Sequence, residues 1–527
     1  MTTVKIRSEV SFTIAMLAIL GLSAAFPAKA AVWYAAAGSN ASDANPGTAE
    51  RPVSSVAKAV SLAKPGDTVV LSPGTYSCSN VTVPDGRPDQ PILLRSEGQG
   101  KVVLTNDGSA NILLLGSYNT VDGIEFHMVS ERPRGAGISV VRKEHVIIRN
   151  CRFFACQVGV SSRSAHYLSI ANCEMAYSGA YGIHLNGSGQ DVRGHWDPAD
   201  ENRYIEVRNC YLHDAGWNVR GTEGYGFTTN GAAEHVVIEN CQIDNNSGNG
   251  ILYEDWTQDS TARYNVIRGS GIAAIWIDNA SMSVFSNNYL EANNVAVWLS
   301  GEESSNRYLD DFISIRNNIV VHNDWSAIDP SVYGKAIFLI TSNTRDTYFD
   351  NNTVAFNTCQ RVVSVQNRPP QNEFRNIWFR NNIFWENSGG VGADPGVDLS
   401  LFHFVNNLWD QPYKGDAQAK TGDPLFVDPQ AHGPEGYKIQ SGSAARGQGM
   451  LLFENPLDFW NGARPHLSKT QKYDIGAHQF GTTGAARAGL DPAAFPFEVP
   501  PYQLRFKAKP PAAHDAAHAI PPARPVQ

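Results

Sequence analysis

Short stretches of alternating apolar and polar residues recur along the chain between residues 120 and 390. Each reads apolar-x-apolar-x-Asn-(Cys or Asn)-x-apolar, as in VIIRNCRF (146–153), IEVRNCYL (205–212) and ISIRNNIV (313–320). A small polar turn and a Gly-apolar-x-apolar segment follow each stretch. Alternation with a period of two predicts short β-strands, and no helical pattern separates them. The chain is therefore expected to be a repeat array built from strands.

Two columns emerge when the repeats are aligned. The first contains Asn150, Asn172, Asn209, Asn240, Tyr264, Asn287, Asn317, Asn351 and Asn381, and the second contains Cys151, Cys173, Cys210, Cys241, Asn265, Asn288, Asn318, Asn352 and Asn382. Members of the second column are 22 to 37 residues apart. Parallel strands stack at about 4.8 Å, so like residues form ladders in which Asn amides can bond between coils. Because the second column alternates with apolar residues, we expect it to point inward.

This pattern predicts an all-β fold, a parallel β-helix of about ten coils. The opening segment WYAAAGSNASDANPGTAERPVSSVAKAVSLAKPGDTVVLSPGTY (33–76) and the late segments DPLFVDP (423–429) and YDIGAHQF (473–480) carry a more specific likeness. Through them the chain resembles the right-handed parallel β-helix superfamily, the pectate-lyase-like group of secreted carbohydrate-active proteins. The resemblance covers residues 32 to about 480. It implies a short N-terminal helix, over about Val53–Ala63, that caps the open end of the solenoid.

The two ends of the chain differ from the repeats. Lys5 and Arg7 precede an apolar stretch, and Ala28-Lys29-Ala30 is typical of a signal-peptidase site, so residues 1–30 are predicted to be a signal peptide. We expect an exported protein, periplasmic or extracellular. The other predicted regions are an N-terminal cap with the first coils (31–119), the core with the groove (120–390), C-terminal coils with a closing segment (391–483), and a disordered Ala/Pro-rich tail (484–527).

Charge narrows the range of partners. Charged residues make up 18% of the chain and the formal net charge is −9, which becomes −11 once the predicted leader is removed. Because no Lys/Arg-rich block occurs, nucleic acid is not an expected partner. No later stretch has 18 consecutive apolar residues, so no membrane span is expected after signal cleavage. A monomer that binds a polysaccharide or oligosaccharide is the expectation.

The seven cysteines are expected to serve packing. Four of them, Cys151, Cys173, Cys210 and Cys241, occupy one inward column. Stacked side chains lie about 4.8 Å apart, whereas disulfide-bonded Cβ atoms lie near 3.8 Å. We therefore expect reduced, buried thiols that pack as small apolar groups.

The resemblance implies that one of the sheets carries a substrate groove, and we assign it to the strands that follow each Gly. Two columns are expected to point outward from these strands. The first is Ser139, Ser161, His184, Thr228, Leu252, Trp276, Trp298 and Phe338, and the second is Val141, Arg163, Asn186, Asn230, Glu254, Asp278, Ser300 and Ile340.

Glu254 and Asp278 are the predicted catalytic pair. They occupy adjacent coils in one outward column, so their backbones should lie about 5 Å apart. Two carboxylates this close cannot both ionise easily, which yields one acid and one base or nucleophile. No cofactor is required for this chemistry, but the pair could instead bind Ca²⁺ with Asp255, or be a solvated acidic edge.

Other residues are expected to bind the sugar. His184, on the groove floor, could act as a general base or a hydrogen-bond partner. Trp276 and Trp298 would form an exposed aromatic stripe, unless a loop covers them. Long insertions around residues 186–203 and 213–226 are expected to wall the groove. The full set of predicted substrate-binding residues is Arg163, Asn186, His195, Trp217, Arg220, Glu223, Asn230, Trp276 and Trp298.

Three functions remain open from the sequence. The first is a secreted glycoside hydrolase that uses Glu254 and Asp278. The second is a calcium-assisted polysaccharide lyase acting on an acidic glycan, with Arg220 or His184 as the base. The third is a non-catalytic glycan-binding or surface protein, because one fold hosts many functions.

Overall fold

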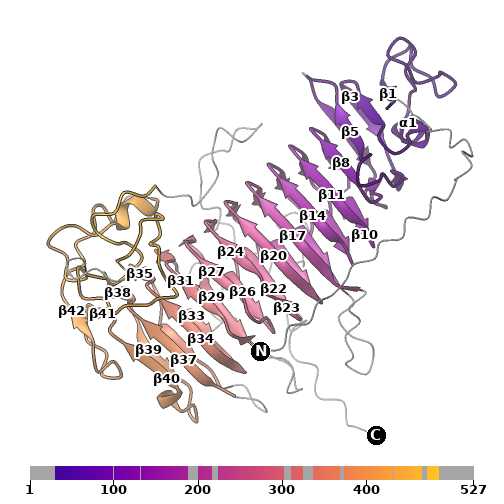
Figure 1. Cartoon of the computed structure of the whole chain (residues 1–527). Coiled ribbons are helices and arrows are strands. Elements are labelled where there is room, and N and C mark those ends of the chain that lie inside the picture. Colours follow the sequence, from indigo (N-terminus) through magenta and orange to yellow (C-terminus); the bar gives the residue numbers. More distant parts are fainter. Residues whose placement is uncertain are drawn as a thin grey trace, which may run out of the picture.

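The computed structural model describes residues 30–485 except 99, 131, 188–199, 217–223, 302–309, 325–335, 368–372, 431 and 466–471. Within this part the chain forms three long parallel sheets that share one elongated core, the predicted parallel β-helix (Figure 1). Along the solenoid each coil contributes in turn to the 12-, 16- and 14-stranded sheets.

Along each coil, the strand of the 16-stranded sheet comes after the strand of the 12-stranded sheet and before that of the 14-stranded sheet. Its strands are β1 (Val32–Ala35), β2 (Thr68–Leu71), β5 (Ile92–Ser96), β8 (Asn119–Asp122), β11 (Glu144–Arg149), β14 (His166–Ala171), β17 (Asn202–Arg208), β20 (Ala233–Glu239), β23 (Thr257–Gln258), β24 (Thr261–Arg263), β27 (Val284–Ser286), β30 (Asp310–Asp311), β31 (Ser314–Arg316), β34 (Thr344–Asp350), β37 (Arg375–Arg380) and β40 (Phe402–Val405).

The 14-stranded sheet follows it across the Asn turn. Its strands are β3 (Gly74–Ser77), β6 (Val102–Asn106), β9 (Glu125–Met128), β12 (Arg152–Phe154), β15 (Glu174–Ala176), β18 (Tyr211–His213), β21 (Gln242–Asp244), β25 (Val266–Arg268), β28 (Tyr289–Glu291), β32 (Ile319–Val321), β35 (Thr353–Ala355), β38 (Ile383–Trp385), β41 (Leu408–Trp409) and β42 (Lys420–Thr421).

The 12-stranded sheet contains the strands assigned to the groove. They are β4 (Val81–Thr82), β7 (Leu113–Leu114), β10 (Ala136–Val141), β13 (Val158–Arg163), β16 (Tyr181–Asn186), β19 (Tyr225–Asn230), β22 (Ile251–Glu254), β26 (Ala273–Asp278), β29 (Val295–Ser300), β33 (Ala336–Ile340), β36 (Arg361–Val365) and β39 (Gly390–Ala393). The sheets thus extend beyond the predicted ten coils, because the aligned columns run only from Asn150 to Asn382 and further coils lie before and after them.

The predicted capping helix is α1 (Val56–Leu62). Ser55 caps it by accepting a hydrogen bond from the backbone N–H of Lys58, and Val56, Ala59 and Val60 are buried. Short 3₁₀ turns, η2 (Leu399–Leu401) and η3 (Pro434–Tyr437), occur near the other end.

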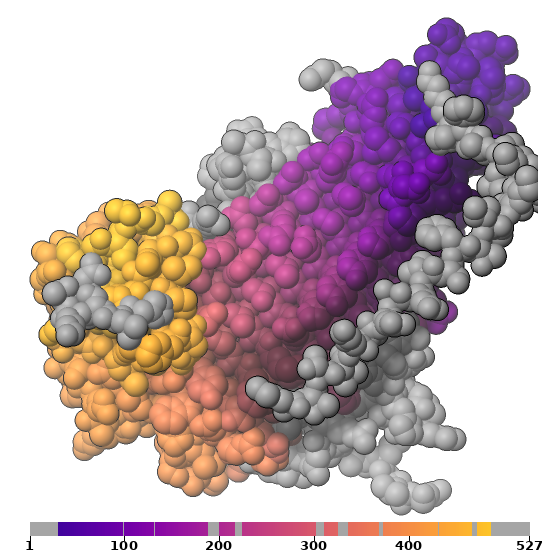
Figure 2. Space-filling view, in the orientation of Figure 1, coloured from indigo at the N-terminus to yellow at the C-terminus, as the bar shows by residue number. Residues whose placement is uncertain are grey.

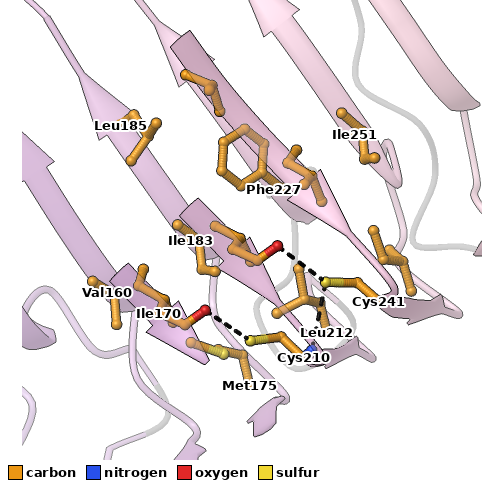
Figure 3. Close-up of a cluster of buried hydrophobic side chains, with 14 of the residues drawn as sticks. Val160, Ile170, Met175, Ile183, Leu185, Cys210, Leu212, Phe227, Cys241 and Ile251 are labelled. Carbon is orange, nitrogen blue, oxygen red and sulfur yellow. Dashed lines mark hydrogen bonds between the residues drawn. The ribbon is translucent and has the colours of Figure 1, made fainter. Parts of the chain in front are cut away.

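The inward column behaves as predicted. All seven cysteines are free and buried, and Figure 3 shows Cys210 and Cys241 among the apolar core side chains. The Sγ of Cys210 lies 3.6 Å from the carbonyl oxygen of Ile170, a weak contact. Burial raises the pKa of the Cys156 thiol to about 12, so this group stays a protonated packing element.

The Asn half of this column is a continuous hydrogen-bonded ladder. The Nδ2 of Asn288 donates to Oδ1 of Asn318, and that of Asn318 donates to Oδ1 of Asn352, both at 3.0 Å. A second inward ladder, not anticipated from the sequence, runs through Asn293, Asn323, Asn357 and Asn387. Its signal was present, because each member stands five residues after a member of the first ladder.

The outer Asn column has positive φ near 54° at its turns, a conformation that Asn tolerates better than most residues. In the N-terminal half these side chains bond to one another, as Asn172 does to Asn150. In the C-terminal half they bond to the closing segment that follows β42. Asn287 donates to the carbonyl of Asp458, and Asn406 donates to the carbonyl of Gln448.

The closing segment (residues 423–430, 432–465 and 472–480) therefore lies along the side of the solenoid, where Figure 2 shows it in yellow. Its buried Arg464 donates to Oδ1 of Asn317 and to the carbonyl of Gly476. Its apolar side chains, including Phe459 and Ile475, pack on outward residues of the 14-stranded sheet.

Candidate functional site

The outer face of the 12-stranded sheet has the predicted register over most of its length. His184 lies opposite Ser161 and Thr228, and Trp276 lies opposite Trp298. The register differs from the prediction at β33, where Trp298 pairs with Leu339. Phe338 and Ile340 therefore point into the core, not outward, and both are fully buried. The prediction failed because the position that is Gly or Ala on the preceding strands is Ile337 here.

A polar row crosses six adjacent strands of this face, and we define it as Arg163, Asn186, Asn230, Glu254, Asp278 and Ser300. The Nδ2 of Asn230 donates to Oε2 of Glu254 at 2.9 Å, which links strands β19 and β22. The predicted neighbours Asn186 and Asn230 are direct register partners. Substrate-binding candidates and carboxylates thus lie in one line along the solenoid.

Glu254 and Asp278 are the centre of this row. They are register partners on β22 and β26, so their Cα atoms are separated by one strand spacing, about 4.8 Å. Asp278 is 8% exposed, whereas Glu254 is only partly buried. The end of β22 is held in place because the backbone N–H of Glu254 donates to Oγ1 of Thr229 at 2.9 Å. The adjacency predicted from the sequence is therefore present.

Asp255 turns away from this strand. Its φ is +46°, and its backbone N–H donates to the carbonyl of Asp278 at 3.0 Å. Over the described parts of the chain, no three His, Cys, Asp or Glu side chains form a group suited to holding a metal ion. The predicted calcium ligands Glu254, Asp255 and Asp278 thus do not constitute such a group.

His184 lies on β16, two strands from β22 and in register with Leu252, which places its Cα atom about 12 Å from that of Glu254. It is therefore not in contact with the carboxylate pair. Its Nε2 is buried without a hydrogen-bond partner, and its ring packs on Tyr181 with centroids 4.5 Å apart. Burial lowers the pKa of His184 to about 4, so the imidazole is neutral at pH 7.

This depressed pKa predicts a loss of stability in acid. The unfolded chain takes up a proton at this histidine near pH 6.5, but the folded protein does so only near pH 4. The free energy of unfolding should thus fall by about 2–3 kcal/mol as the pH drops from 7 to 4.5. Urea unfolding of His184→Gln should lack this part of the decrease. An unchanged pH dependence in the variant would contradict the buried neutral ring.

Trp276 and Trp298 are not the exposed stripe that was predicted. Their rings stack with centroids 4.1 Å apart, but they are only 6% and 1% exposed. Trp276 donates its indole N–H to Ser300 and Trp298 donates to Thr341. Both belong to an apolar cluster on the outer face that includes Leu252 and Leu339. The alternation of apolar and polar residues correctly predicted that both side chains point outward. It did not predict that they are buried on this face.

Arg163 stands at the N-terminal end of the polar row. Its Nη2 lies 3.2 Å from Oδ2 of Asp200, whose other oxygen contacts Arg142. The arginine is thus engaged in a shared ion pair. The remaining predicted binding residues, Arg220, Trp217, Glu223 and His195, lie outside the described residues.

Two tyrosines on this face were missed by the sequence reasoning. Tyr181 and Tyr225 are register partners, their ring centroids are 5.5 Å apart, and Tyr181 contacts His184. A signal existed, since each directly precedes the Gly of a groove strand. They extend the candidate site beyond the two predicted columns.

His213 and Asp214 were expected in a wall of the groove, but His213 belongs to the 14-stranded sheet. Its buried ring lies between Asp214, at 2.8 Å, and Glu174, at 3.1 Å. Burial opposes the charged ring, yet these two carboxylates outweigh it and raise the pKa of His213. His213 therefore pairs with carboxylates on and next to the 14-stranded sheet and does not line the candidate site.

Comparisons with known proteins agree with the fold. Residues 33–250 match the family model described as the Pel9A-like right-handed β-helix region. No curated protein sequence matches the chain. The prediction of a right-handed, pectate-lyase-like parallel β-helix is therefore confirmed.

Solved structures with a similar fold include carbohydrate-related proteins of different kinds. The PL6 family alginate lyase AlyGC, as a point mutant, has a TM-score of 0.56 and 16% identity over 84% of this chain and 58% of its own. XylC in complex with xylose has a TM-score of 0.52 and 11% identity over 86% and 99%. The GH136 lacto-N-biosidase of Eubacterium ramulus, as its selenomethionine derivative, has a TM-score of 0.50 and 15% identity over 69% and 67%.

These likenesses establish the fold alone. Among the described residues, no helix is long and apolar enough to cross a membrane.

Proposed function

We propose that this protein is an exported polysaccharide-degrading enzyme, a glycoside hydrolase whose catalytic groups are Glu254 and Asp278. The observation that carries the proposal is their pairing in register on adjacent strands of an outward sheet face. The similar structures, which include a lyase and a glycosidase, support a carbohydrate substrate.

The surroundings of the two carboxylates suggest separate roles. Glu254 accepts a hydrogen bond from Asn230, which favours its charged form, so we assign it as nucleophile or base. Asp278 is more buried, and burial favours the neutral form, so we assign it as the acid. Carboxyl groups about 5 Å apart suit retaining hydrolysis, in which one residue forms a covalent intermediate. The proposed outcome is retention of the anomeric configuration.

The hydrolase is favoured over a calcium-assisted lyase by the residues of the polar row. Ca²⁺ takes six to eight oxygen ligands, and Glu254, Asp255 and Asp278 do not form a group suited to a metal. A lyase must also neutralise a uronate carboxylate, and the one arginine of the row, Arg163, is already paired with Asp200. The proposed reaction therefore uses the two carboxylates and a water molecule.

Residues N-terminal to the pair would bind the sugar. Asn186 and Asn230 offer amides to its hydroxyl groups, and neutral His184 lies beside them on the same face. Tyr181 packs against this imidazole and would supply an apolar surface. The proposed sugar-binding residues thus occupy the strands next to those that carry the two carboxylates.

A panel of neutral and acidic polysaccharides tests the proposal. Purified protein should release new reducing ends from at least one neutral polysaccharide without an increase in ultraviolet absorbance. Unsaturated products that absorb in the ultraviolet would assign a lyase instead. Binding without either product would assign a non-catalytic glycan-binding protein.

A further inference from the structure

A ladder of stacked aromatic rings stands on the outer face of the 16-stranded sheet, a different sheet from the one with the polar row. We define the aromatic ladder as Tyr118, His145, Tyr167, Tyr204 and His235. Successive ring centroids are 4.5 to 4.8 Å apart, and the rings are within 15° of parallel. Tyr167 and Tyr204 remain 47% and 44% exposed. Large aromatic groups are thus displayed to solvent over consecutive coils.

The backbone does not require aromatic residues at these positions. Every member of the ladder has φ between 54° and 56°, a conformation that Asn and Asp adopt more readily than bulky residues. The equivalent positions of later coils, also with positive φ, are Asp259, Met282, Phe312, Asp346 and Asn376. Stacked aromatic rings thus occupy this column from Tyr118 to His235, whereas the later coils carry other side chains with the same backbone conformation.

Four members of the ladder, all except Tyr118, form one wall of a hollow of about 550 Å³. Its floor is Ile147, Ser169, Glu206 and Val237, which are register partners on four successive strands. Sites for small molecules usually measure 300–1,000 Å³ and combine an apolar lining with a few polar groups. This hollow has that character, because methyl groups and ring edges surround the hydroxyl of Ser169 and the carboxylate of Glu206.

We propose that this hollow is a second carbohydrate-binding site, which holds a neutral oligosaccharide along the ladder. The apolar floor and ring edges would contact the C–H groups of the sugar, while Ser169, Glu206 and the tyrosine hydroxyls would bond to its hydroxyls. We expect a neutral glycan because no Lys or Arg is among the described residues that line the hollow, and Glu206 is already paired with Arg208. The choice of carbohydrate as the ligand class rests on the proposed function.

The ladder offers a matched set of variants. Tyr167→Ala with Tyr204→Ala removes two rings that line the hollow. Tyr118→Ala removes a ring with the same φ and the same stacking that does not line it. Both variants should remain folded, with far-ultraviolet circular dichroism and thermal unfolding as the check.

The experiment is calorimetric titration with xylohexaose, mannohexaose, cellohexaose and, as an acidic probe, hexagalacturonate. At least one neutral hexasaccharide should bind wild type and Tyr118→Ala equally, but bind the double variant at least about tenfold more weakly. Cleavage of a short soluble substrate should be the same in all three proteins. Equal binding by the double variant, preferential binding of hexagalacturonate, or no binding of any neutral probe would overturn the inference.

The outcomes separate this inference from the proposed function. Ladder-dependent binding in a protein that cleaves no polysaccharide would refute the hydrolase and leave the second site standing. Cleavage together with ladder-independent binding would refute only the second site. A change of oligomeric state in the double variant, measured by light scattering, would make the ladder an interface between copies and also overturn the inference.

Discussion

Glu254→Gln should lower the rate of polysaccharide cleavage by roughly a thousandfold or more, because it removes the proposed nucleophile or base. Gln keeps the size of the side chain and can still bond to Asn230, so the fold and substrate affinity should be retained. The measurement is the initial rate of reducing-end release, with substrate binding measured in parallel by calorimetry.

Asp255→Asn is the matched control for this experiment. It removes the same charge from the adjacent residue, which turns away from β22 with a positive φ. Its rate should stay within a few-fold of wild type, since this half-buried side chain is not one of the two proposed catalytic groups. Equal activity of Glu254→Gln and wild type would show that the catalytic groups lie elsewhere.

Asn318→Leu should cause the largest loss of stability among single changes in the core. The side chain is 1% exposed, donates to Phe285 and Asn352, and accepts two hydrogen bonds from Asn288. Leu would leave those buried groups unpaired, at about 1–3 kcal/mol each. We expect the free energy of unfolding to fall by about 4–5 kcal/mol in urea titrations.

Cys173→Ala, in the thiol half of the same column, provides the comparison. Its Sγ makes only weak contacts, at 3.2 and 3.7 Å to two carbonyl oxygens. Removing one sulfur atom should therefore cost about 1 kcal/mol, mostly through lost packing. If both variants were destabilised equally, the hydrogen bonds of the Asn ladder would not be the source of its stability.

Much of the fold followed from the sequence because each coil repeats the same physical requirements. The Asn of each turn marks a positive φ, and the inward column at Cys173 or Asn318 marks the core. The register of Glu254 against Asp278 followed from counting residues after a Gly. The count failed at β33 because Ile337 replaces the small residue that served as the reference.

Burial on the outer faces could not be predicted in this way. Alternation gives the direction of Trp276 and Trp298, but their burial depends on what lies over the sheet, and that is not encoded within the strand. For the same reason, His213 was placed in a groove wall, although its partners are Glu174 and Asp214 on another face. The exposed ladder of Tyr167 was overlooked because no repeat motif marks the residue at the start of each strand.

The closing segment has a consequence for how the solenoid comes apart. A stack of coils normally frays from its ends, because each coil contacts only its neighbours. Here the outer asparagines from Asn287 to Asn406 are hydrogen-bonded to the closing segment, whose buried Arg464 also donates to Asn317. The C-terminal coils should therefore unfold together as one unit. The coils before Tyr264, whose outer asparagines bond to one another from coil to coil, should instead unfold one at a time.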